Sequence, residues 1–362
     1  MSTWGKNLKI SIFGESHGPA IGVVIDNLPH GYKIDINEVV LQMGRRAPGK
    51  DITPTPRFEA DTPVIQSGLL NNITTGAPLC ALIYNKNTRS SDYNNLVRTP
   101  RPSHADYPAY LRYGGFNDIA GSGHFSGRLT APLVFAGAIC RQILSTKNIV
   151  IGAHAYEIAG IKDTPFDMAD ITYEKLDELS HRTAPIINPD AEKLMRESIE
   201  KARMDCDSVG GIVECAAVNM PAGIGSPMFD GVENRIASII FGIPAVRGIE
   251  FGAGFAASKM RASEHNDPYY YDSDNIRTRT NNHGGAIGGI TSGMPILFRV
   301  AFKPTASIAK QQDTIDLISK NNTKLIIKGR HDPCIVLRAI PVVESACAIA
   351  LLDLLMDCNG KI

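Results

Sequence analysis

Three short segments of the sequence each place a histidine among small, rigid or charged residues. They surround His17, His104 and His331, far apart in the chain. Histidine titrates near neutral pH and transfers protons in many enzymes. Glycine and proline hold the backbone in conformations that let such a side chain approach a ligand closely. With arginines near two of the histidines, the segments predict a site that binds an anion and moves protons.

Each histidine also has a simpler interpretation when taken alone. Ser16 and His17 follow a predicted strand and lie between Gly14 and Gly18, where a histidine commonly satisfies a local backbone group. Asp106 could orient the imidazole of His104 if a turn brings the two together; otherwise the segment is a solvated loop. The three segments therefore carry the argument jointly.

Cationic and glycine-rich segments could supply the anion site. Arg45, Arg46 and Lys50 follow the first predicted helix. The loop 121–128 precedes an apolar helix, where backbone amides can bind phosphate, although such loops are common without a ligand. The loop 284–293 permits close contact with a flat ligand, or is a packed β-bulge.

Two further segments near the C-terminus combine a cation with other polar groups. Lys303 to Ser307 offers one cation and two hydroxyls, which suit a phosphate. Arg330 and Asp332 supply another cation and a possible base.

Composition limits the class of protein. The 362 residues contain 37 Lys and Arg and 37 Asp and Glu, so no global basic field attracts nucleic acid or an anionic membrane. None of the seven cysteines forms a Cys-x-x-Cys pair and no His-Glu-x-x-His occurs, so no metal site is predicted. The cysteines are scattered, the sequence has no secretion signal, and its apolar runs are short or interrupted by Asp353. These features predict a cytoplasmic protein with no membrane partner.

The elements that must position these residues follow from periodicity and turn residues. Periodicity predicts strands over 8–13 and 20–26, helices over 35–43, 129–143, 190–202 and 342–356, and a loop over 45–61. Residues 160–205 are more polar and read as a peripheral segment, and no Gly/Ser linker divides the chain. We therefore expect one domain over residues 1–362.

An internal repeat emerges when the sequence is aligned with itself at an offset of 192. Both copies end an apolar strand with Asn-apolar-Pro-x-Gly, at Asn27 and Asn219. The segments beginning at Arg128 and Arg338 also match, each leading into an apolar helix. The pattern predicts two similar halves related by a pseudo-twofold axis, with His17 replaced by valine in the second half.

Taken together, these blocks resemble the chorismate synthase family from Trp4 to about Leu355. The blocks that carry the resemblance are Phe13-Gly-Glu-Ser-His-Gly18, Arg45-Arg46, Arg101-Pro-Ser-His-Ala-Asp-Tyr107, Ser126 to Arg128, Asn266-Asp267, Gly284 to Gly293, Lys303 to Ser307 and Gly329 to Cys334.

The resemblance implies a fold and an activity. Members of the family convert 5-enolpyruvylshikimate 3-phosphate into chorismate and phosphate, an anti 1,4-elimination that needs reduced FMN without net redox change. The implied fold is an α+β sandwich of helices between two antiparallel β-sheets with an internal pseudo-twofold repeat, usually assembled as a homotetramer. NADPH is the reductant in bifunctional relatives; without a Rossmann fingerprint here, we expect an external reductant.

The resemblance also assigns residues. His17 would protonate the departing phosphate, His104 the reduced flavin, and Asp332 would help remove a proton, with Ser16 and Ser126 in support. The FMN contacts implied are His124, Ser126, Ala245, Gly288, Lys303, Pro304, Thr305, Ala306, Ser307 and Arg330. The substrate contacts implied are Arg45, Arg46, Lys50, Arg101 and Arg128.

Several positions depart from the family pattern. Ile52, Ala120 and His124 stand where relatives commonly have arginine, and Phe125 replaces a serine. Fewer cations weaken phosphate binding, which keeps open a flavin-binding protein that has lost or altered the lyase activity. A metal-dependent hydrolase is the third alternative, and it lacks ligand spacing. We expect the lyase.

Overall fold

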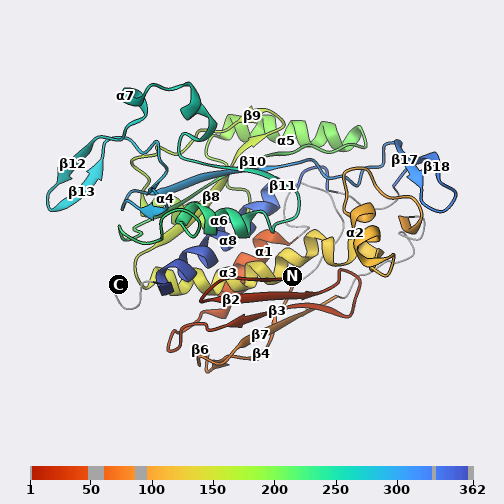
Figure 1. Ribbon diagram of the computed structural model, residues 1–362, viewed down its shortest axis with the longest axis horizontal. Coiled ribbons are helices and arrows are strands. Elements are labelled where there is room, and N and C mark those ends of the chain that lie inside the picture. The colour runs from red at the N-terminus through yellow and green to blue at the C-terminus, as the bar shows by residue number, and fades with distance from the viewer. Residues whose placement is uncertain (1, 48–60, 86–95, 328–331, 358–362) are drawn as a thin grey trace.

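The computed structural model describes residues 2–47, 61–85, 96–327 and 332–357. Two five-stranded antiparallel sheets enclose a layer of helices (Figure 1). The first sheet has the order β1 (Thr3–Trp4), β2 (Lys9–Gly14), β3 (Ala20–Asp26), β7 (Leu79–Tyr84), β4 (Val64–Ser67). The second has the order β11 (Val246–Phe251), β16 (Ile296–Phe302), β10 (Gly211–Val218), β8 (Val150–Ile158), β9 (Ile161–Lys162).

Four helices fill the layer between the sheets. They are α1 (Ile36–Arg46), α3 (Thr130–Ser145), α6 (Val232–Ile240) and α8 (Val336–Asp357). Helices α3 and α8 are apolar nearly all round, as expected of helices buried on all sides. Gly137 on α3 permits their close approach, since a Cβ there would lie 2.1 Å from Cβ of Ser345 on α8. The main hydrophobic core runs through this layer and includes residues from Leu8 to Leu355. The expected sandwich of helices between two antiparallel sheets is confirmed.

The remaining elements lie outside this sandwich. Helix α4 (Tyr173–His181) packs on the outer face of the second sheet, where Leu176 and Leu179 join Val150 and Leu297 in a separate apolar cluster. The other helices are α2 (Asp106–Tyr113), α5 (Pro189–Met204), α7 (Ala262–His265), η2 (Ala120–Phe125), η3 (Gly127–Leu129) and η4 (Gly254–Lys259). Two-stranded ribbons are β5–β6 (Leu69–Leu70, Ile73–Thr74), β12–β13 (Tyr269–Asp272, Asn275–Thr278), β14–β15 (Ala286–Ile287, Ile290–Thr291) and β17–β18 (Gln312–Asp316, Asn321–Leu325).

The topology contains the predicted repeat. Elements β2-β3-α1-β4-β7-α3 of the first half recur as β8-β10-α6-β11-β16-α8 in the second, with the same strand order within each sheet. Asn27 and Asn219 both adopt left-handed backbone conformations, with φ of 60° and 65°. Their side-chain amides donate to the carbonyls of Asn7 and Asn148, each just before the neighbouring strand. Asparagine tolerates this conformation, so the Asn-apolar-Pro-x-Gly pattern records equivalent turns.

Helix α8 corrects one expectation. It begins at Val336 rather than near Val342, because Pro341 is accommodated within the helix and the Ser345 hydroxyl donates to the Pro341 carbonyl at 2.6 Å. At 22 residues it is long and apolar enough to cross a membrane by length and composition, contrary to the prediction that Asp353 shortens the apolar run. It is 94% buried within the fold, as a core helix is. Asp353 is itself buried and ion-paired with Arg235 of α6.

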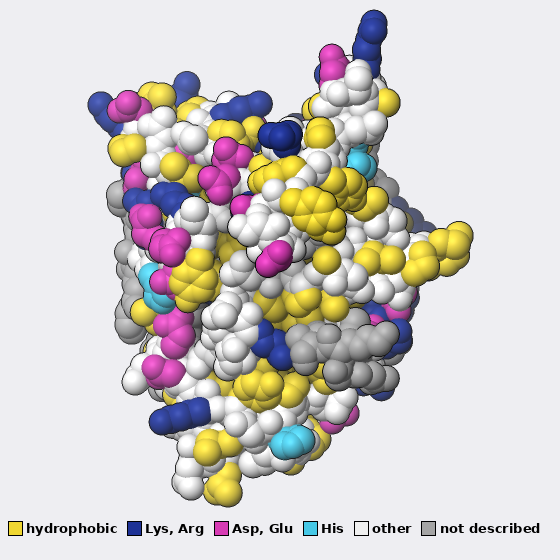
Figure 2. All heavy atoms as spheres, turned by 90° about the vertical axis from the view of Figure 1, so that its left-hand side faces the viewer, with side chains coloured by type: hydrophobic (Ala, Val, Ile, Leu, Met, Phe, Trp, Pro, Cys, Tyr) yellow, Lys and Arg dark blue, Asp and Glu magenta, His cyan; other side chains and the backbone are white. Residues whose placement is uncertain are grey.

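The exterior carries charges of both signs. On the face seen in Figure 2, the described Lys and Arg side chains are scattered among acidic and apolar ones rather than gathered in a patch. This distribution agrees with the zero net charge of the sequence.

Candidate active site

A cavity of about 980 Å³ opens between the N-terminal end of α2, the loop 120–128, the segment 241–247, the loop 302–307 and the start of α8. It collects most of the predicted site residues. Those that line it are Ser16, Arg46, Arg101, His104, His124, Ser126, Arg128, Ala245, Lys303, Thr305, Ala306, Ser307 and Asp332. Those that do not are His17, Arg45, Gly288 and Pro304. Lys50, Ile52 and Arg330 lie outside the described residues.

His104 enters the cavity beside a buried carboxylate. Ser103 has a φ of 56°, and this left-handed turn brings the imidazole back toward Asp106 at the start of α2. Nδ1 of His104 lies 2.6 Å from Oδ1 of Asp106. Burial alone would raise the pKa of Asp106, but hydrogen bonds from Arg101 and His104 outweigh it and hold that pKa well below its usual range. Asp106 is therefore ionised, and it orients the histidine.

The glycine-rich loop forms one wall. Gly121, Ser122 and Gly123 all have positive φ, which folds the loop over Ser16, whose N–H donates to the Gly123 carbonyl at 3.1 Å. A Cβ on Gly121 would lie 2.5 Å from Nε2 of His17. The ring of His17 thus packs against Gly121, which itself lines the cavity. His124 lines the cavity and contacts the Ser2 hydroxyl at 2.9 Å and the Gly14 carbonyl at 3.1 Å.

Two arginines on a second wall share one carboxylate. Arg46 donates to Asp61 at 2.8 Å, and Arg128 is ion-paired with the other oxygen of Asp61. Arg128 also donates to Asn85 at 3.1 Å. All three charged side chains are almost fully buried. Among the described residues, this wall brings two guanidinium groups together at one carboxylate, and guanidinium groups are suited to binding carboxylate and phosphate.

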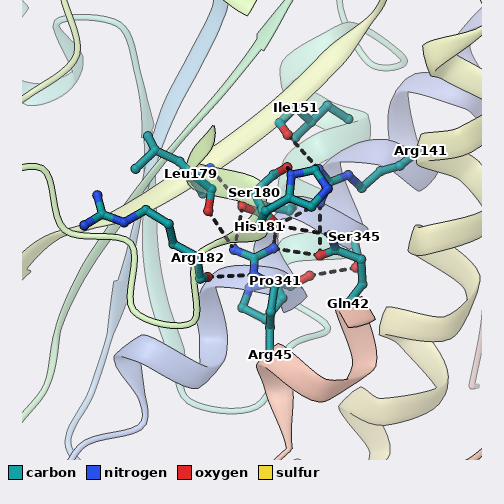
Figure 3. A network of polar contacts seen from close by, with 12 residues as sticks. Gln42, Arg45, Arg141, Ile151, Leu179, Ser180, His181, Arg182, Pro341 and Ser345 are labelled. Atoms are coloured by element: carbon teal, nitrogen blue, oxygen red, sulfur yellow. Dashed lines mark hydrogen bonds and ion pairs between the residues drawn. The ribbon is translucent and has the colours of Figure 1, made fainter. Parts of the chain in front are cut away.

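Arg45 does not reach the cavity. The predicted loop over 45–61 begins too early, because α1 continues through Arg46, and successive helical residues point about 100° apart, as 3.6 residues per turn requires. The Arg45 guanidinium instead donates to Glu344 of α8 at 2.5 and 3.2 Å. It also donates to the carbonyl of Arg182 at 3.0 Å (Figure 3). Glu344 is fully buried and also binds Arg141. Arg45 therefore has a structural role here, in place of the expected substrate contact.

A third wall carries cations and an unsatisfied hydroxyl. Burial, together with the nearby charge of Arg247, lowers the pKa of Lys303. Oγ1 of Thr305 is buried and has no hydrogen-bond partner within the part of the chain that the structure describes. Two like charges near a buried, unused polar atom are unfavourable without a ligand, so this wall suits a phosphate group. Sequence reasoning missed Arg247, which has no motif of its own and is brought in by β11.

Asp332 and Arg338 form an ion pair at the N-terminal end of α8, and both line the cavity. Nε of Arg338 also donates to the backbone carbonyl of Arg46 at 3.0 Å. In the internal repeat, Arg338 is the counterpart of Arg128, and both arginines line the same cavity. This correspondence is the signal in the sequence that points to Arg338.

Among the described residues, no group of three or more His, Cys, Asp or Glu side chains could hold a metal ion. The cavity instead combines a histidine–carboxylate pair, a second carboxylate and several cations. Such a site can bind a multiply charged anion and transfer protons to and from it.

The comparisons with known proteins agree on one family. The family described as chorismate synthase matches residues 8–356. The chorismate synthase of Dehalococcoides mccartyi is 47% identical over 352 residues, which cover 97% of this chain and 95% of that protein. The chorismate synthase of Korarchaeum cryptofilum is 45% identical over 356 residues, covering 98% and 97%. A chorismate synthase crystal structure superimposes with a TM-score of 0.76 at 26% identity, covering 99% of this chain and 94% of that one.

Proposed function

Because the chain belongs to the chorismate synthase family, we propose that it converts 5-enolpyruvylshikimate 3-phosphate into chorismate and phosphate, with reduced FMN as its cofactor. The observation that carries the proposal is the cavity, which joins the His104–Asp106 pair to walls of cationic side chains. The substrate has one phosphate and two carboxylates, and the guanidinium groups of Arg46 and Arg128 in the cavity lining suit such anions.

The reaction breaks one carbon–oxygen bond and one carbon–hydrogen bond and forms the second double bond of the chorismate diene. Phosphate leaves with the electron pair of the carbon–oxygen bond, and a proton leaves the ring. Reduced FMN, when bound, supplies electron density as the phosphate departs and recovers it afterwards.

The protein's own groups bind the anions and hold the protons. Arg46 and Arg128 bind and orient the substrate at the wall that carries Asp61. His104 exchanges a proton at the cavity, and Asp332, which is ion-paired with Arg338, accepts one. His17, whose ring packs against Gly121 at the edge of the cavity, donates a proton to the departing phosphate.

The residues present fit a flavin phosphate on the third wall. Lys303 and Ser307 flank Thr305, whose buried hydroxyl lacks a partner. A phosphate oxygen would accept from that hydroxyl and offset the cost of its burial, which is about 1–3 kcal/mol. We expect Thr305→Val to leave the protein folded and to weaken FMN binding about tenfold, measured by flavin fluorescence titration. Unchanged FMN affinity would place the flavin phosphate elsewhere.

The first experiment is anaerobic turnover. The protein is mixed with chemically reduced FMN and 5-enolpyruvylshikimate 3-phosphate, and the absorbance of the chorismate diene is followed together with phosphate release. Both signals rising together support the lyase. If FMN binds and neither signal appears, the absence of arginine at Ala120 and His124 has abolished turnover. A flavin-binding protein without this activity then becomes the better assignment.

We also propose a homotetramer in the cytoplasm, one domain per chain, and dependence on an external reductant rather than on the protein's own use of NADPH. Family resemblance supports the tetramer, and light scattering after gel filtration tests it. Replacing the chemical reductant by NADPH in the turnover assay tests self-sufficiency.

A further inference from the structure

Arg101 lines the cavity, but its guanidinium is already committed to protein groups. The residue is only 4% exposed. Nε and one terminal nitrogen donate to the two oxygens of Asp106 at 2.8 and 2.7 Å. The other terminal nitrogen donates to the Ser307 hydroxyl at 3.1 Å, and the Ser122 hydroxyl lies 3.0 Å from the first. A guanidinium has five donors, and these partners occupy both of its long edges. Little donor capacity remains for a substrate anion.

The same contacts determine which ring nitrogen of His104 must carry a hydrogen. Oδ1 of Asp106 lies 2.6 Å from Nδ1 of the imidazole, and an ionised carboxylate can only accept. Nδ1 must therefore carry a hydrogen. The alternative, with Nδ1 accepting from Arg101 at 3.1 Å, would leave two acceptors facing each other at 2.6 Å. Nε2 is then the nitrogen available to exchange protons with a ligand.

Arg101 also connects three cavity walls. Its partners belong to the turn 101–106, the glycine-rich loop at Ser122 and the loop at Ser307. The backbone N–H of Arg101 donates to Asp106 as well, at 3.0 Å, which closes the turn. Arg101 therefore fixes the position of the carboxylate that orients the histidine.

We propose that Arg101 and Asp106 are positioning residues that hold His104 with its proton on Nδ1 and its Nε2 toward the cavity. Arg101 thus serves the reaction through His104 rather than by binding the substrate, contrary to the role that the resemblance implied. The inference rests on the proposed function only in that His104 takes part in turnover.

The direct test is the tautomer of His104, read by NMR from protein labelled with ¹⁵N in its imidazoles. The His104 signals are identified by their loss in His104→Gln. We expect the neutral ring of the wild type to carry its hydrogen on Nδ1. In Asp106→Asn, the amide oxygen is held by the N–H groups of Arg101, so the amide NH₂ faces Nδ1 and moves the hydrogen to Nε2. A wild-type ring with its hydrogen on Nε2 overturns the proposal, and this result depends on no variant.

Kinetics and binding separate positioning from substrate recognition. For Arg101→Gln we expect kcat to fall by about a hundredfold, the usual contribution of a general acid–base group. The affinity for 5-enolpyruvylshikimate 3-phosphate, measured by calorimetry with oxidised FMN, should change by less than about threefold. Loss of a direct charge-assisted contact would instead weaken affinity by about tenfold or more.

Arg112→Gln is the matched control, since Arg112 lies on α2 outside the cavity lining. It should match the wild type in tautomer, kcat and affinity. Weakened affinity with unchanged kcat in Arg101→Gln overturns the proposal. If the wild type forms no chorismate at all, the proposed function fails, while the tautomer and affinity measurements still decide the role of Arg101.

Discussion

Arg45 and Arg46 are adjacent at the end of α1, yet the structure predicts opposite consequences of replacing them. Arg45 lies in a buried network with Glu344 and Arg141, away from the cavity. Arg46 lines the cavity beside Asp61. We expect Arg45→Met to lower stability and leave the kinetic constants of the folded enzyme unchanged. Arg46→Met should impair substrate binding in protein that still folds.

The cost of Arg45→Met follows from what remains around Glu344. Removing one partner of a buried ion pair typically destabilises by about 3–5 kcal/mol, because the other charge is left uncompensated. Glu344 keeps Arg141 at 3.0 Å and the Ala153 N–H at 3.0 Å. We therefore expect the lower end, about 3 kcal/mol. Methionine keeps much of the arginine volume, so cavity formation adds little.

Urea unfolding followed by circular dichroism measures this cost. With a slope of about 3 kcal/mol/M, the midpoint should fall by about 1 M. Arg196→Met, which removes a partly exposed pair with Glu192 on α5, is the control and should shift it far less. An Arg45→Met protein as stable as the wild type, with a raised KM for the substrate, would refute the structural role of Arg45.

Two further predictions concern stability. His154 is fully buried between Asp163 and Glu214, whose hydrogen bonds outweigh burial and raise its pKa above the ordinary 6.5. The contribution of the charged His154 to stability is therefore complete below pH 6.5 and is lost as pH rises through the folded-state pKa. The urea midpoint of the wild type should fall as pH rises through this range, and that of His154→Gln should fall less. If the midpoints of the two proteins change with pH in parallel, the prediction is wrong. Gly137→Ala should lower the free energy of unfolding by about 1–3 kcal/mol, because the added methyl meets the backbone and Cβ of Ser345 on α8. An unchanged urea midpoint would show instead that α3 and α8 can move apart at little cost.

Local patterns in the sequence predicted the elements that depend on local interactions. Strand β3 was predicted with its observed bounds, and the Asn-apolar-Pro-x-Gly repeat located equivalent turns at Asn27 and Asn219. The short spacing of His104 and Asp106 made their contact possible if a turn brought them together, and the left-handed turn at Ser103 does so. Such features need only backbone preference and short spacing, which the sequence states directly.

Long-range features of the site could not be read in this way. The side to which Arg45 points depends on three more residues of helix in α1 and on Glu344, about 300 positions later. Arg247 and Arg338 reach the cavity through β11 and α8, so their roles depend on the packing of whole elements. The contact between Arg101 and Ser307 is of the same kind, since the two residues lie far apart along the chain.

The internal repeat explains how one cavity acquires different walls. The turns at Ser16 and Ser208 are equivalent in the two halves, and each precedes the corresponding strand, β3 or β10. Ser16 lines the cavity directly. The Ser208 hydroxyl instead donates to the Thr305 carbonyl at 2.8 Å and so helps to hold the third wall of the cavity in place. The next residue is His17 in the first turn and Val209 in the second, whose N–H donates to the Pro333 carbonyl at 2.8 Å beside Asp332. The first segment therefore contributes Ser16 to the cavity lining, and its counterpart positions the loops that carry Thr305 and Asp332. The asymmetry of the cavity lies in the side chains of two segments that occupy equivalent places in a nearly symmetric fold.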